Sequence, residues 1–217
     1  MKKDLSEFID SGATLKSGSG KWSEIKESLI ESSDDLIVIT SKSCKKFISN
    51  IPSKFTLVIN EEPSLNLIDN YFDQIYKIIN KTHEITYIAL GGGSVIDTAK
   101  ILSLMIANNI GSSKEAIDKS NSNNISEKSK IICIPSTAGT GAEITPFSTI
   151  WDKKKGLKYS IITSKINREI ILDPEISLSL PEKITISTGL DSSCQILEST
   201  WSKKANSKSL SAASLGF

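Results

Sequence analysis

The sequence predicts an α/β fold in which a parallel β-sheet carries helices on both of its faces. Short apolar runs typical of buried strands alternate with longer segments whose apolar residues recur at helical spacing. Two turns rich in glycine and hydroxyl residues each follow one of the strand-like runs. Alternation of this kind builds parallel β-α units, so we expect one large α/β domain within the 217 residues.

The first half of the chain alternates between expected strands and expected helices. Apolar runs predict strands at 36–40, 55–60, 85–90 and, after a gap, 131–134. A helix is predicted over 64–81, where apolar residues form one stripe: Leu65, Ile68, Phe72, Ile75, Tyr76 and Ile79. A second helical stripe runs through Val95, Ala99, Leu102 and Met105 or Ile106.

The second half contains a polar connection, a hairpin and a long helix. Residues 111–130, rich in Ser, Asn and Lys, predict a loosely ordered connection with a short helix around 114–118. Strands at 146–151 and 157–162 are expected to form a hairpin about the charged turn between them. Pro181 begins a helical stretch that extends to about Trp201.

The turn after the third expected strand consists of Gly91, Gly92, Gly93 and Ser94. Glycines let backbone N–H groups approach a ligand closely, and Ser94 with Asp97 three residues on has the spacing of a helix-capping box. A helix N-terminus delivered by such a turn binds anions, most often phosphate. An ordinary tight strand-to-helix turn explains the same residues, so this motif alone leaves both readings open.

A second turn follows the strand expected at 131–134 and contains Ser136, Thr137, Gly139, Thr140 and Gly141. Thr140 and Glu143 repeat the capping-box spacing, which predicts a helix start here. In an open parallel sheet both turns lie at the carboxyl edge, where nucleotides bind. Two such turns together favour a nucleotide site.

Taken together, these residues resemble the iron-containing (group III) alcohol dehydrogenase family. That family carries a Gly-Gly-Gly-Ser-x-x-Asp-x-Ala-Lys block, which residues 91–100 match. Its Thr-Thr-Ala-Gly-Thr-Gly-Ser-Glu block is matched by residues 136–143, with Ser136 and Ala142 as departures. Residues 172–175 and 188–191 match later landmarks of the family in the same order. Dehydroquinate synthases and glycerol-1-phosphate dehydrogenases share only the first block.

The resemblance implies an NAD(P)-dependent alcohol dehydrogenase or aldehyde reductase. It implies a Rossmann-like, parallel-sheet nucleotide-binding domain at residues 1–180 and the truncated start of an all-helical metal-binding domain at 181–217, because family members are nearly twice as long. The N–H groups of the turn at Gly91, Gly92, Gly93 and Ser94 would hold the dinucleotide pyrophosphate.

The resemblance also implies roles for single side chains around the cofactor. Asp97 would order the loop and reach toward the nicotinamide. Thr137 and Thr140 would donate hydroxyls to the phosphate and adenosine portions. Lys158 matches a lysine that the family often places near the nicotinamide ribose, although a solvated strand lysine is an equal alternative. The sequence assigns no catalytic residue.

The choice between NADP and NAD depends on the end of the first expected strand. Many NAD-preferring members place an acidic residue there, which accepts from the ribose 2′-OH and repels a 2′-phosphate. Here Ser41 and Lys42 offer a hydroxyl and a positive charge instead. We therefore expect NADPH to bind at least as well as NADH.

The metal site that the resemblance implies is incomplete in this sequence. Family enzymes hold Fe²⁺ or Zn²⁺ through one Asp and three His; Asp191 stands at the Asp position, but Gln195 stands where the first His is expected. The chain has one histidine, His83, which we interpret as a solvated loop residue. Asp191, Gln195 and Glu198 share one helix face, which points either into an interdomain cleft or into water.

Composition excludes several other partners. Lys and Arg total 26 against 25 Asp and Glu, so neither nucleic acid nor an anionic membrane surface is indicated. No apolar run is long enough to span a membrane, and three widely spaced cysteines argue against a disulfide framework. These features predict a cytoplasmic location, and the family resemblance adds a homodimer.

The substrate implied by the resemblance is a small aldehyde or alcohol. Residues 189–191 and 197–206 look most like phosphonoacetaldehyde reductases within the family, which suggests phosphonoacetaldehyde. Two alternatives stay open from sequence: a non-catalytic nucleotide-binding remnant of such an enzyme, and a gene remnant that hardly folds because the helix near 190–201 exposes apolar area.

Overall fold

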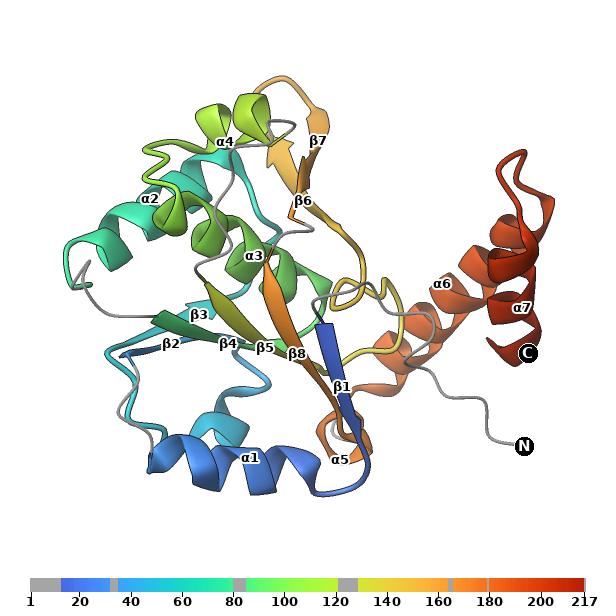
Figure 1. Ribbon diagram of the computed structural model, residues 1–217, viewed down its shortest axis with the longest axis horizontal. Helices are drawn as coiled ribbons and strands as arrows, with labels where there is room; N and C mark the ends of the chain where they lie inside the picture. The colour runs from blue at the N-terminus through green and yellow to red at the C-terminus, as the bar shows by residue number, and fades with distance from the viewer. Residues whose placement is uncertain are drawn as a thin grey trace.

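The computed structural model describes residues 13–31, 35–79, 85–120, 129–163, 166–178 and 180–216. A six-stranded, all-parallel sheet runs in the order β1-β8-β5-β4-β2-β3 through its centre (Figure 1). Its strands are β1 (Ala13–Ser17), β2 (Asp35–Ser41), β3 (Phe55–Ile59), β4 (Ile85–Gly91), β5 (Lys130–Pro135) and β8 (Asn167–Leu172). The predicted α/β class with a parallel sheet is confirmed.

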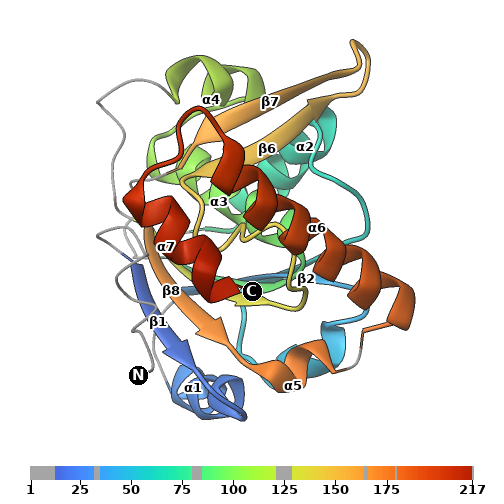
Figure 2. The same ribbon diagram turned by 90° about the vertical axis from the view of Figure 1, so that its right-hand side faces the viewer.

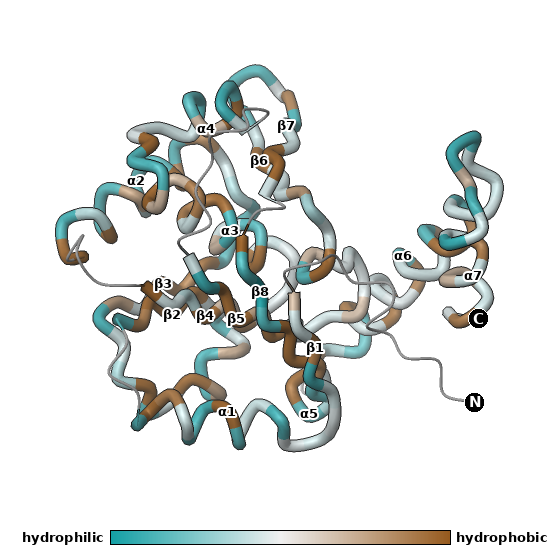
Figure 3. The backbone as a smooth tube through the Cα atoms, viewed as in Figure 1, coloured by the Kyte–Doolittle hydropathy of each residue, from teal (hydrophilic) through white to brown (hydrophobic). Residues whose placement is uncertain are grey.

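Helices cover both faces of the sheet. One face carries α2 (Leu65–Tyr76), α3 (Gly93–Ala107) and α4 (Ser113–Lys119), and the other carries α1 (Lys21–Ile30), the 3-10 turn η2 (Lys45–Ile48) and α5 (Pro174–Ser177) (Figure 1). Strands β2 and β4 are almost entirely buried, because apolar side chains on both faces pack under these helices. Figure 3 shows the hydrophobic residues concentrated in these central strands.

Two further parts lie beside this sheet. Strands β6 (Phe147–Asp152) and β7 (Leu157–Ile162) form the antiparallel hairpin that the sequence predicts. This hairpin packs next to α3. The helices α6 (Glu182–Trp201) and α7 (Ser207–Gly216) pack against each other at one side of the molecule (Figure 2). None of the α6 residues is buried, and Ile186, Leu190 and Trp201 are more than half exposed.

The expected helix start at Ser94 is wrong by two residues. Helix α3 begins at Gly93, with Gly92 as its N-cap residue, and no side chain caps it. Ser94 therefore lies inside the first turn, where its carbonyl accepts from the Thr98 hydroxyl at 2.8 Å. The three glycines allow the turn to close earlier than a capping serine would.

The helix start predicted at Thr140 is also wrong. Residues 136–146 contain no helix; the chain reverses at Gly141, whose φ of +60° is left-handed. Backbone N–H groups of Ile144 and Thr145 both donate to the Gly141 carbonyl, which closes a turn and no more. A capping-box spacing without a following apolar stripe was therefore a false signal.

Four elements were not predicted from the sequence: the edge strand β1, its neighbour β8, and helices α1 and α7. Helix α4 confirms the short helix expected around 114–118. His83, expected in a solvated loop, lies outside the described residues, as do 121–128 of the polar connection. No helix in the described ranges is long and apolar enough to span a membrane.

Candidate functional site

A cleft of about 1040 Å³ opens at the carboxyl ends of β2, β3, β4 and β5. The hairpin β6–β7 and Thr188 of α6 complete its walls. Eight of the nine predicted cofactor residues line it: Ser41, Gly92, Gly93, Ser94, Asp97, Thr137, Thr140 and Lys158. The topology thus brings together, at the predicted edge, residues that are up to 117 positions apart in the sequence, from Ser41 to Lys158.

Gly91, the ninth residue, has a packing role instead. It ends β4 and is buried, and a Cβ added there would lie 2.5 Å from Val95 Cγ2. Glycine therefore lets α3 start directly against the strand end. The first N–H groups of α3, at Gly93 and Ser94, have no carbonyl one turn earlier to bind, and no side chain caps them. These donors and the positive end of the helix dipole face the cleft.

The threonine-bearing turn packs directly against the glycines. A Cβ added at Gly92 would lie 3.4 Å from Thr137 Oγ1, and one at Gly93 would lie 2.7 Å from Thr140 Oγ1. The Ser136 N–H donates to the Gly91 carbonyl at 2.9 Å, which joins the ends of β4 and β5. Hydroxyls and free N–H groups therefore converge on one point, as an anion site requires.

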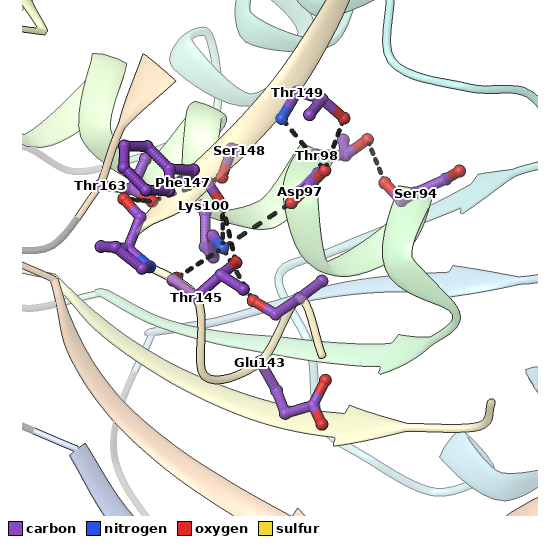
Figure 4. A network of polar contacts seen from close by, with 12 residues as sticks. Ser94, Asp97, Thr98, Lys100, Glu143, Thr145, Phe147, Ser148, Thr149 and Thr163 are labelled. Atoms are coloured by element: carbon purple, nitrogen blue, oxygen red, sulfur yellow. Dashed lines mark hydrogen bonds and ion pairs between the residues drawn. The ribbon is translucent and has the colours of Figure 1, made fainter. Parts of the chain in front are cut away.

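Asp97 is occupied by the hairpin. Its Oδ2 accepts from the Thr149 N–H at 3.0 Å and the Thr149 hydroxyl at 2.8 Å, so it fastens β6 to α3 (Figure 4). Lys100 Nζ lies 3.7 Å from Asp97 Oδ1 on the other side. Burial lowers the pKa of Lys100, and the attraction of Asp97 partly opposes this shift.

The side chains of Lys100 and Arg168 are buried cations beside residues 136–146, the loop that connects β5 to β6. Lys100 is fully buried, and Nζ donates to the carbonyls of Ala142 (2.8 Å), Thr145 (3.2 Å) and Phe147 (2.6 Å). Arg168 of β8, 1% exposed, donates to the same Thr145 carbonyl at 2.7 Å. Sequence reasoning missed Arg168, because β8 was not predicted and a charged residue there gave no signal of burial.

The far wall holds Lys158 and Trp151, which are directly opposite each other in the hairpin. Lys158 Nζ lies 5.4 Å from the centroid of the Trp151 ring, within cation–π range. Both residues line the cleft. Trp151 was not predicted as a site residue, but the alternation of β6 places it on the same face as Thr149, which touches Asp97.

The cofactor-choice residues lie at the other end of the cleft. Ser41, the last residue of β2, exchanges a hydrogen bond with Ser43 at 3.0 Å between the two Oγ atoms. Lys42 is exposed and lines the cleft beside them. These three positions thus carry two hydroxyls and an ammonium group, and Glu61 and Glu62 after β3 also line the cleft.

The expected metal ligands do not assemble a site in the described residues. Asp191 and Gln195 are exposed on α6, and the Gln195 amide donates to Asp191 Oδ2 at 3.0 Å. No group of three or more His, Cys, Asp or Glu side chains with metal-binding geometry occurs in the described ranges. One carboxylate and one amide do not fit a tetrahedral Fe²⁺ or Zn²⁺ centre built on three imidazoles.

The α6 face that carries Asp191 is placed next to the threonine turn. The Ser192 hydroxyl donates to the carbonyls of Ala138 at 2.9 Å and Gly139 at 3.3 Å. Asp191 Oδ2 lies 3.4 Å from the position of a Cβ added at Gly139. The sequence left two alternatives for this helix face: an interdomain cleft or water. In the structure the face lies beside the cleft described above, and its side chains stay exposed.

Comparison with known proteins agrees with this geometry. A model of the family described as "Iron-containing alcohol dehydrogenase" matches residues 13–174, more than half of the chain. The chain belongs to the iron-containing alcohol dehydrogenase family. The predicted resemblance is thereby confirmed, as is the Rossmann-like character of the sheet domain, since solved members of the family superimpose on it.

Three relatives illustrate the similarity. NADPH-dependent butanol dehydrogenase of Clostridium saccharobutylicum is 34% identical over 51% of this chain and 29% of its own length. Phosphonoacetaldehyde reductase of Streptomyces viridochromogenes is 30% identical over 57% of this chain and 32% of its own. The crystal structure of sulfoacetaldehyde reductase from Bifidobacterium kashiwanohense in complex with NAD⁺ is 28% identical, with a TM-score of 0.71, over 90% of this chain and 53% of that one.

The matched chain spans about half the length of that solved relative, and less of the curated ones. The similarity therefore establishes the family and the cofactor-domain fold. Activity, substrate and partners of a whole protein remain to be proposed.

Proposed function

We propose that this chain forms the dinucleotide-binding domain of an NAD(P)-dependent alcohol dehydrogenase or aldehyde reductase, with residues 1–180 as that domain and 181–217 as the start of a helical one. The observation that carries the proposal is the uncapped N-terminus of α3, which opens beside Thr137 and Thr140 onto the cleft. A pyrophosphate would satisfy the free N–H groups and the helix dipole together.

Different residues of the chain contact different parts of the dinucleotide. The N–H groups at Gly93 and Ser94 bind phosphate oxygens, and the hydroxyls of Thr137 and Thr140 donate to the same portion. Lys158, held over Trp151, binds near the nicotinamide ribose. Asp97 keeps the hairpin wall in place through Thr149. The bound nicotinamide supplies hydride chemistry, and the protein positions it.

We propose that NADPH binds at least as tightly as NADH. Ser41 and Lys42 lie where an acidic residue would repel a 2′-phosphate, and the butanol dehydrogenase relative is NADPH-dependent by name. Ser41→Asp should weaken NADPH binding by about tenfold and leave NADH binding equal or tighter, since it adds the repelling charge. Tighter binding of NADH by the unsubstituted chain would contradict the proposal.

We assign no role to a metal ion, because Asp191 and Gln195 do not fit an Fe²⁺ or Zn²⁺ site. We expect the chain alone to bind nucleotide without metal-dependent turnover. A non-catalytic nucleotide-binding protein is the alternative, and it predicts the same binding. Aldehyde reduction that depends on added Fe²⁺ or Zn²⁺ by this chain alone would exclude that alternative.

As substrate we propose a small, anionic aldehyde such as phosphonoacetaldehyde. Two relatives are named for phosphonoacetaldehyde and sulfoacetaldehyde, which both carry an acidic group. A homodimer is proposed from the family alone, and light scattering tests it. Nicotinamide fluorescence during titration with NADPH and NADH tests the cofactor proposal: saturable binding supports it, and no binding of either nucleotide overturns it.

A further inference from the structure

The segment that carries Thr137 and Thr140 has little regular structure of its own. Between β5 and β6 it contains a turn at Gly141 and no helix or strand. Backbone carbonyls in such a segment need partners, because an unpaired buried carbonyl is costly. Here they are bound by side chains from other elements of the fold.

Ser192 of α6 binds the carbonyls of Ala138 and Gly139, and two buried cations bind carbonyls further along the segment. Lys100 of α3 donates to the carbonyls of Ala142, Thr145 and Phe147 (Figure 4). Arg168 of β8 donates to Thr145 at 2.7 Å and approaches the Glu143 carbonyl at 3.5 Å. The Thr145 carbonyl thus accepts from two cations that enter from different elements.

Arg168 is hard to explain as a stabiliser of β8. It is 1% exposed, it forms no ion pair with a carboxylate of the described residues, and its Nε lacks a hydrogen-bond partner there. Burying a guanidinium group costs a large desolvation free energy, and an apolar side chain of similar size usually stabilises a core more. What Arg168 contributes is its Nη1 group, which donates to the Thr145 carbonyl of an irregular loop and approaches the Glu143 carbonyl of the same loop.

We propose that Arg168 is a positioning residue for the cofactor cleft. Together with Lys100 it fixes the carbonyls of Ala142, Glu143, Thr145 and Phe147, and so helps to hold the turn that presents Thr140 against Gly93 and Thr137 against Gly92. This inference deepens the proposed function and rests on it for the statement that the threonines face a dinucleotide. The loop-holding role itself is independent of the ligand.

The test compares three variants. Arg168→Met keeps side-chain length but removes the donors, and Arg168→Lys keeps a charge that reaches one carbonyl. Ile171→Val, on the same strand and fully buried, lowers stability from the opposite face of the sheet, where Ile171 packs in the core with Ile132 and Ile134. Each variant is examined by thermal unfolding, by amide hydrogen exchange without nucleotide, and by NADPH titration.

The reporter amides are those of Ile144 and Thr145, which donate to the Gly141 carbonyl inside the loop. In Arg168→Met we expect their exchange to accelerate while central β4 amides keep their protection, and NADPH affinity to fall by about tenfold. Arg168→Lys should recover part of both effects. Ile171→Val should lower the unfolding temperature with loop exchange and affinity unchanged.

Two results would overturn the proposal. One is loop exchange in Arg168→Met that rises only in step with all other amides, as a general loss of stability produces. The other is an equal loss of NADPH affinity in Ile171→Val. Should Arg168→Met fail to fold, Arg168→Lys decides by the same local comparison. Absence of NADPH binding to the unsubstituted chain would refute the proposed function, whereas the exchange measurement would still decide the role of Arg168.

Discussion

Substituting Gly93 by alanine perturbs the point where the two turns meet. The added Cβ would lie 2.7 Å from Thr140 Oγ1 and 3.5 Å from Thr140 Cγ2, closer to the oxygen than real Cβ atoms come. The backbone at Gly93 is helical and accepts alanine, so the strain falls on the threonine. Thr140 must rotate or move away, which withdraws its hydroxyl from the phosphate position.

The expected loss is that of one hydrogen bond to a charged group, about 1.5–3 kcal/mol. NADPH should therefore bind roughly 10- to 100-fold more weakly to Gly93→Ala. Titration by nicotinamide fluorescence measures this, and circular dichroism confirms that the variant is folded. Gly111→Ala is the matched control, because an added Cβ there has no heavy atom within 4 Å and Gly111 does not line the cleft.

Wild-type affinity in a folded Gly93→Ala variant would refute the reasoning, since it would mean that neither the α3 N-terminus nor Thr140 contacts the nucleotide. An equal loss in Gly111→Ala would contradict the assignment of the effect to the cleft.

Three further predictions concern stability. The Tyr87 hydroxyl is buried without a hydrogen-bond partner in the described ranges, so Tyr87→Phe should raise the free energy of unfolding by about 1 kcal/mol in urea titrations, and a clear decrease would contradict this. Burial opposes ionisation of Glu169, but bonds from Lys16 and Lys130 outweigh it and hold its pKa below the ordinary value. Its contribution is therefore present above about pH 4.3 and lost as the pH falls through the folded-state pKa; Glu169→Gln should cost about 1 kcal/mol at pH 7 and nothing in strong acid. Burial raises the pKa of Glu143, so ionising it costs stability as the pH rises from its unfolded-state pKa of about 4.3 through the raised folded-state pKa. Glu143→Gln should gain stability over the wild type across that range, and a pH-independent difference would argue against this.

The central strands and the cleft were predictable because their signals are local. Apolar runs at 36–40 and 85–90 are long enough to mark strands buried on both faces, and glycines such as Gly92 mark backbone that must approach another group. Parallel topology then brings the two turns to one edge. Placing both turns at one edge requires only the strand order along the chain and no knowledge of which residues contact each other.

Strands β1 and β8 and the buried cations were not predictable by the same means. Strand β8 reads Asn-Arg-Glu before its apolar residues, so its pattern is that of a surface segment, and only the tertiary structure buries Arg168. The false helix start at Thr140 has the same cause: Lys100 and Arg168 satisfy carbonyls that helical hydrogen bonds would otherwise bind. Long-range side-chain donors decided the local conformation.

The most direct test of the cofactor site is a ¹⁵N–¹H correlation spectrum of the assigned chain during addition of NADPH. The account predicts that the largest amide shifts fall at Gly93 and Ser94, with further shifts at Thr137 and Thr140, and that they saturate together. Shifts confined to other surfaces, or a spectrum unchanged by NADPH and by NADH, would contradict the claim that this cleft binds a dinucleotide.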